Sequence, residues 1–118
     1  MARHLLKLDY DYDCLLIGIS CHLKDYRLCW ALNKALNINL QKAARFVEIH
    51  NKKAGHKERF ALFDHLDEET ETQYNLISNR CANGFLLPEH KEADYFLQVK
   101  DAPHLSCYEM ANRIRAID

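Results

Sequence analysis

The sequence predicts a two-layer α+β fold: an antiparallel sheet of about five to six strands, with two helices packed on one face. Several short apolar segments follow one another with only brief polar turns between them, which favours antiparallel pairing. Two other segments, one after the N-terminal strands and one at the C-terminal end, repeat their apolar residues at helical spacing. Each amphipathic helix must bury its apolar face, and one face of the sheet is the obvious surface for both.

The size and composition fit a single domain, residues 1–118, of globular type. The formal net charge of −1 gives no global electrostatic argument for a nucleic-acid or anionic-membrane partner. The longest apolar run, residues 14–19, is too short to cross a bilayer, and the N-terminus has no signal-peptide pattern. The five cysteines are odd in number and lack short paired spacings, which favours free thiols and a cytoplasmic location.

The N-terminal part is predicted to form a hairpin. Residues 6–13 alternate strictly, as in a strand with one apolar and one acidic face. The continuous apolar run 14–19 is typical of a buried strand. We expect a tight bend near Asp11 to Asp13, and one long strand with a bulge is the alternative.

Residues 22–37 are predicted to form the first helix, because nothing within them breaks a helix. The apolar residues at helical spacing are Tyr26, Cys29, Trp30, Leu32 and Leu36. Ser20 is the candidate N-cap, with Asp25 as an alternative, and Asn37 suits the left-handed position after the last turn. Trp30 is interpreted as a core residue or an interface anchor.

The rest of the chain supplies further strands and the second helix. The strands are predicted at residues 46–50, 59–66, 73–80, 85–87 and 95–99. Asn83-Gly84 suits a tight turn, and Pro88 ends regular strand pairing. Pro103 suits the start of the C-terminal helix. The apolar stripe of that helix would be Cys107, Met110, Ala111, Ile114 and Ile117.

No metal, cofactor or catalytic motif is predicted. Asp9, Asp11 and Asp13 match the first ligand positions of an EF-hand loop, but Cys14 and Ser20 stand where its glycine and bidentate glutamate are required. The cysteines near His22 lack the close ligand pairs of structural zinc sites. The chain also lacks a nucleophile elbow, a phosphate-cradling glycine loop and a His-Glu-x-x-His motif.

Two polar groups remain as candidate sites. Glu89, Asp94 and Tyr95 flank a four-residue connection and could form a binding pocket together with Arg27. The competing structural interpretation is that the carboxylates bind backbone N–H groups and shape the turn, while Tyr95 buries its ring in the sheet. The second group is a basic loop that could contact nucleic acid. Its cationic residues are Lys52, Lys53, Lys57 and Arg59.

Three stretches of the chain resemble a bacterial family of unknown function named for an Ile-Pro-Glu-x-x-x-Asp-Tyr signature. The signature region here is Leu87-Pro88-Glu89 followed by Asp94-Tyr95-Phe96-Leu97, and residues 16–20 and 25–33 also look like that family. Leu87 replaces the isoleucine, and four residues rather than three separate Glu89 from Asp94. The IPExxxDY family has no assigned activity, so the resemblance implies no catalytic residue and favours a cytoplasmic, non-enzymatic protein.

Three functions are consistent with these observations. The preferred one is a non-enzymatic interaction or regulatory module that forms a homodimer, because short strands with exposed edges favour self-association. The second is an enzyme or a small ligand-binding domain with a polar pocket near Glu89, Asp94 and Arg27. The third is nucleic-acid binding through the loop 52–59, for which the slightly acidic net charge gives no support.

Overall fold

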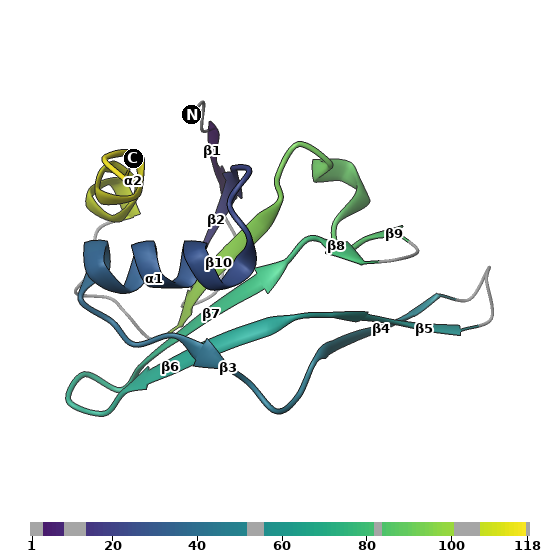
Figure 1. Ribbon diagram of the computed structural model, residues 1–118, viewed down its shortest axis with the longest axis horizontal. Helices are drawn as coiled ribbons and strands as arrows, with labels where there is room; N and C mark the ends of the chain where they lie inside the picture. Colours follow the sequence, from purple (N-terminus) through teal and green to yellow (C-terminus); the bar gives the residue numbers. More distant parts are fainter. Residues whose placement is uncertain (1–3, 9–13, 52–55, 82–83, 101–106, 118) are drawn as a thin grey trace.

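A six-stranded antiparallel sheet forms the body of the protein, in the order β1-β2-β10-β7-β6-β3 (Figure 1). The structure is a computed structural model, and it describes residues 4–8, 14–51, 56–81, 84–100 and 107–117. The strands of this sheet are β1 (His4–Leu8), β2 (Cys14–Ser20), β3 (Gln41–Lys42), β6 (Leu62–Asp67), β7 (Thr72–Ser78) and β10 (Tyr95–Lys100). The helices are α1 (Asp25–Leu36) and α2 (Cys107–Arg115), and both lie over the same face of the sheet (Figure 1). The predicted α+β class is confirmed.

Two short two-stranded ribbons extend from this body. The first pairs β4 (Val47–Asn51) with β5 (His56–Phe60), and the second pairs β8 (Arg80–Cys81) with β9 (Gly84–Phe85). A 3₁₀ turn, η1 (Pro88–His90), then leads into β10. No helix in the described part of the chain is both long and apolar enough to cross a membrane.

The main core lies between the helices and the central strands. Leu97 is fully buried in the middle of β10, directly opposite Ile17 of β2 and Leu76 of β7. Because side chains alternate along a strand, every second residue of these strands faces the helices. The helices contribute their own buried residues to this core: Leu28, Cys29, Leu32, Leu36, Met110 and Ile114.

The opposite face of the sheet also buries apolar side chains. Phe96 and Leu62 are almost completely buried there, and both lie opposite Ile77 in the register of the strands. Farther along the same strands, the side-chain amide of Asn75 donates to Gln98 Oε1 at 3.1 Å. This face is therefore apolar toward the start of β10 and polar toward its end.

The N-terminal hairpin is confirmed, since β1 and β2 pair antiparallel from His4–Ser20 to Leu8–Leu16. The predicted bend near Asp11 to Asp13 lies outside the described residues. Asn37 has φ 55° and ψ 50°, so it occupies the left-handed position predicted after α1.

The predicted N-cap of α1 is wrong. The helix begins at Asp25, and the N-cap position belongs to Lys24, which makes no side-chain capping bond. Asp25 instead lies in the first turn, where Oδ1 of its carboxylate accepts the N–H of Tyr26 at 2.7 Å. A carboxylate there also interacts favourably with the positive end of the helix dipole.

Three predicted strand boundaries are corrected. The strand predicted at 59–66 is divided at Ala61, because β5 pairs with β4 whereas β6 pairs with β7. The strand predicted at 73–80 ends at Ser78. The strand predicted at 85–87 contains only Phe85, because Asn79 binds the backbone N–H groups of Leu86 and Leu87. Asn83 and Pro103, for which the sequence predicts a turn and a helix start, lie outside the described residues.

The burial of Leu97 leads to a first prediction. Leu97→Ala should lower the free energy of unfolding by about 2–5 kcal/mol, because it removes a fully buried side chain from the central strand and leaves a cavity. Urea unfolding followed by circular dichroism measures this loss. Lys100→Ala, on the same strand at an exposed position, is the control and should change stability by less than ~0.5 kcal/mol. Equal losses in the two variants would contradict the assignment of Leu97 to the core.

Candidate functional site

Asp94 lies where the ends of three strands meet, and every polar atom of this residue has a bonding partner. Its backbone N–H donates to Ile19 O at 2.8 Å, and its backbone carbonyl accepts the N–H of Asn79 at 2.9 Å. Its carboxylate Oδ2 accepts the N–H of Cys21 at 3.0 Å, and Oδ1 lies 3.0 Å from Nη2 of Arg80. Asp94 therefore joins the end of β2, the end of β7 and the start of β10.

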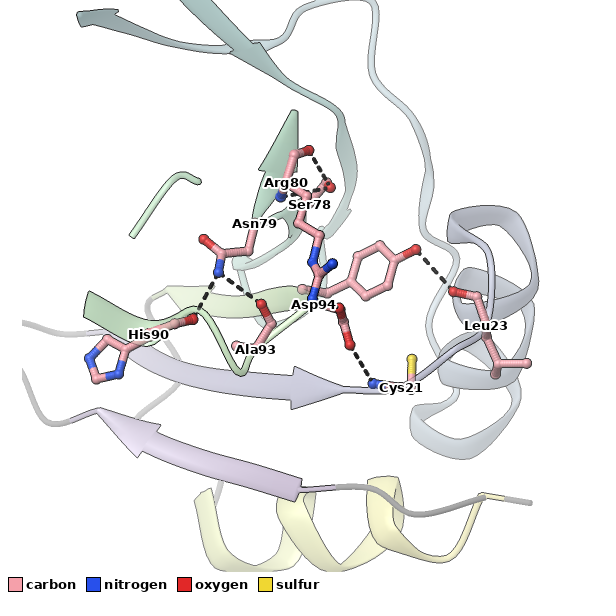
Figure 2. Close-up of polar contacts among 9 residues, drawn as sticks. Cys21, Leu23, Ser78, Asn79, Arg80, His90, Ala93 and Asp94 are labelled. Carbon is pink, nitrogen blue, oxygen red and sulfur yellow. Dashed lines mark hydrogen bonds and ion pairs between the residues drawn. The ribbon is translucent and has the colours of Figure 1, made fainter. Parts of the chain in front are cut away.

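Asn79 is fully buried and organises the segment that precedes Asp94. Its side-chain amide donates to the carbonyls of His90 at 2.9 Å and Ala93 at 2.8 Å (Figure 2). Its Oδ1 accepts the N–H of Leu87 at 2.8 Å, and its backbone carbonyl accepts the N–H of Leu86 at 2.8 Å. A buried amide with all these partners costs little in desolvation and fixes the path of residues 86–93.

Tyr95 connects the same cluster to the segment before α1. Its hydroxyl donates to the carbonyl of Leu23 at 3.0 Å (Figure 2). Burial of the ring, and to a smaller extent the negative charge of Asp25, raises the pKa of Tyr95 to about 12. Tyr95 therefore acts as a neutral hydrogen-bond donor at physiological pH.

The Asp94 cluster, which comprises Asn79, Arg80, Asp94 and Tyr95, is built to hold backbone segments in place. General acid–base chemistry near neutral pH needs a group whose pKa lies near 7. Burial raises the pKa of Tyr95 and the pKa of Cys29 to about 12, which moves both values farther from 7. Within the described residues, no group of three or more His, Cys, Asp or Glu side chains is arranged to hold a metal ion.

The structure brings together only part of the predicted binding site. Asp94 and Tyr95 are neighbours in the cluster, whereas Glu89 lies exposed on η1 and Arg27 lies exposed on α1. Within the described part of the chain, neither Glu89 nor Arg27 has a hydrogen bond or an ion pair to Asp94. The cation that binds Asp94 is Arg80.

Sequence reasoning missed Asn79 and Arg80. Both lie at the end of a predicted strand, where polar residues usually face water, so their types gave no signal of a specific partner.

The guanidinium carbon of Arg80 lies 5.6 Å from the centroid of the Phe85 ring, and Nζ of Lys91 lies 5.8 Å from the same centroid. Phe85 therefore makes cation–π contacts with two cations beside the Asp94 cluster.

The predicted basic loop is described only in part. Lys52 and Lys53 lie outside the described residues, as does the side chain of Lys57. Arg59 is exposed on β5, and its Nε lies 3.2 Å from Oε1 of Glu48 on the neighbouring strand. The charge of Arg59 is therefore partly balanced within the β4–β5 ribbon.

A groove between the two helices is a second candidate site, and the sequence did not predict it. This α1–α2 groove has a volume of about 510 Å³ and is lined by Trp30, Ala31, Lys34, Ala35, Arg113, Ala116 and Ile117. Trp30 is 68% exposed, so it is a surface residue. Of its two interpretations, core residue and interface anchor, the first is therefore wrong. Nζ of Lys34 lies 5.3 Å from the centroid of the Trp30 ring. The groove is thus an apolar surface with cations at its edge.

Comparisons of this chain with protein-family models, with curated proteins and with solved structures gave no match.

The buried amide of Asn79 leads to a second prediction. Asn79→Ala should lower the free energy of unfolding by at least ~2 kcal/mol, because the carbonyls of His90 and Ala93 and the N–H of Leu87 all lose their partner. Hydrogen exchange gives a local measurement: the amide of Leu87 should exchange faster than in the original protein. Ser78→Ala is the control: it removes an exposed hydroxyl that donates to the carbonyl of Arg80 and accepts the N–H of Arg80, and it should cost about 1 kcal/mol. An unchanged exchange rate at Leu87 would contradict the role given to Asn79.

The raised pKa of Tyr95 leads to a third prediction. The folded protein holds the phenol proton more tightly than the unfolded chain, so Tyr95 stabilises the fold below pH 10 and this contribution is lost as the pH rises toward 12. Ultraviolet absorbance of phenolate, compared between the original protein and Tyr95→Phe, should place the titration of Tyr95 well above pH 10. Tyr26→Phe is the matched control, since Tyr26 is exposed. A difference titration centred near pH 10 for Tyr95 would refute this prediction.

Proposed function

We propose that this protein is a non-enzymatic interaction module that acts as a cytoplasmic homodimer. The observation that carries the proposal is the exposed aromatic surface of the helical layer. Tyr26 and Trp30 lie one turn apart on α1 and are 63% and 68% exposed, and Trp30 also lines the α1–α2 groove. Large aromatic side chains are enriched at the centres of protein interfaces, where they contribute much of the binding energy.

The Asp94 cluster supports the non-enzymatic part of this proposal. Both carboxylate oxygens of Asp94, the whole amide of Asn79 and the hydroxyl of Tyr95 bind groups of the protein itself. A catalytic group needs a polar atom that can reach a substrate. These polar atoms instead fix the start of β10, which is a structural role.

The location and the family relationship are part of the same proposal. Among the described residues, Cys21, Cys29 and Cys81 form no disulfide, as expected of a protein in a reducing compartment. Asp94 and Tyr95 carry the resemblance to the IPExxxDY family, and a structural role for both residues fits a signature without an assigned activity. We therefore also propose membership of that bacterial family.

The oligomeric state tests the proposed function and is the fourth prediction. Light scattering after size-exclusion chromatography should give about twice the chain mass of 13.9 kDa. Trp30→Ser should weaken the dimer by about 30-fold, as expected for a central aromatic residue of an interface. Phe46→Ser is the matched control, because Phe46 is also exposed but lies outside the groove.

Trp30 is the single tryptophan of the chain, so its fluorescence reports directly on this surface. Its emission should shift to longer wavelength on dilution, as the dimer dissociates and the ring becomes hydrated. A monomeric mass at high micromolar concentration would overturn the proposed homodimer.

A further inference from the structure

We infer that each protomer of the homodimer uses its α1–α2 groove to bind the acidic turn of its partner, residues 66–71. This inference rests on the proposed function, since it names the surfaces through which the two copies meet. It follows from the charge, the exposure and the position of both surfaces.

The groove carries two cations that have no ion pair with any residue that the structure describes. Lys34 and Arg113 are exposed at the groove, and within the described residues neither has an ion pair. The other residues that line the groove are alanines, Trp30 and Ile117, so none of them is acidic. A segment that combines carboxylates with an apolar side chain is the complementary occupant.

The acidic turn between β6 and β7 has this composition. Leu66 is 52% exposed, and Glu68, Glu69 and Glu71 beside it are exposed as well. Within the described part of the chain, none of these three glutamates has an ion pair. The turn therefore presents an apolar side chain together with three carboxylates that have no cationic partner among the described residues.

The conformation of the acidic turn is already fixed in the free protomer. The N–H of Glu69 donates to Oδ1 of Asp67 at 3.1 Å, and Glu71 adopts the left-handed conformation with φ 58°. The hydroxyl of Thr70 donates to the hydroxyl of Thr72, which is fully buried, at 2.8 Å. A rigid turn loses little conformational entropy on binding, which favours affinity.

The positions of the two surfaces favour a second copy of the chain as the occupant. The β6–β7 turn and the C-terminal half of α1 lie toward the same end of the long axis (Figure 1). No residue of the turn lines the groove of its own protomer. In a two-fold dimer that meets at this end, each turn can enter the groove of the partner, and the contact is made twice.

Reversed charges provide the experiment and the fifth prediction. The groove variant is Lys34→Glu with Arg113→Glu, and the turn variant is Glu68→Lys with Glu69→Lys. In each variant alone, groove and turn carry charges of the same sign and repel each other. The dissociation constant of the dimer should therefore rise at least ~30-fold at low salt. In an equimolar mixture, every groove again faces a turn of opposite sign, so a heterodimer should form. Sedimentation velocity with one variant fluorescently labelled measures both effects.

A matched control separates specific pairing from a general effect of charge. Lys42→Glu with Arg45→Glu reverses two exposed cations that do not line the groove, and this variant should dimerise as the original protein does. Circular dichroism of each variant confirms that it is folded before mixing.

The outcomes distinguish this inference from the proposed function. If the original protein is a dimer and either charge variant alone dimerises equally well, the groove–turn contact is wrong while the homodimer stands. If both variants dissociate but their mixture does not form a heterodimer, groove and turn do not contact each other across the dimer, and the inference is also wrong. If the original protein is a monomer, the proposed function and this inference fail together.

Discussion

The four bonds of Asp94 hold the sheet together at the point where the end of β2, the end of β7 and the start of β10 meet. Its backbone connects β2 and β7 to the start of β10, and its carboxylate binds the N–H of Cys21 and the guanidinium of Arg80. Asn79 completes this arrangement, because it binds the backbone of the segment that delivers Asp94 to its position. The register of the central strands, and with it the core under both helices, depends on these contacts.

The two candidate sites differ in whether their polar side chains have hydrogen-bond or ion-pair partners within the protein. In the Asp94 cluster the carboxylate, amide and hydroxyl groups all have internal partners, so binding a ligand there would first require breaking those bonds. At the α1–α2 groove, Lys34 and Arg113 have no ion pair within the described residues and lie beside an exposed tryptophan. The α1–α2 groove, with its exposed apolar area and its cations, is therefore the surface at which binding a partner would be more favourable.

Local patterns in the sequence predicted the fold class and the two helices, and they singled out Asp94 and Tyr95 without deciding between a binding pocket and a structural role. They could not predict the strand order or the partner of Asp94, because both depend on contacts between residues far apart in the chain, such as Cys21 and Asp94. Asn79 looks like an ordinary residue at a strand end, and it is buried only because residues 86–93 fold over it. Trp30 shows the same limit, since helical spacing is identical for a core residue and for an exposed one.

The central position of β10 has a consequence for how the chain folds during synthesis. β10 follows every other strand that the structure describes, yet it lies between β2 and β7 in the sheet. Until it leaves the ribosome, the β1–β2 hairpin and the β6–β7 hairpin have no common neighbour and expose unpaired edges. Such a topology depends on long-range contacts, so the central sheet cannot be completed before residue 100 has emerged, and the edges of both hairpins stay open to wrong pairing until then.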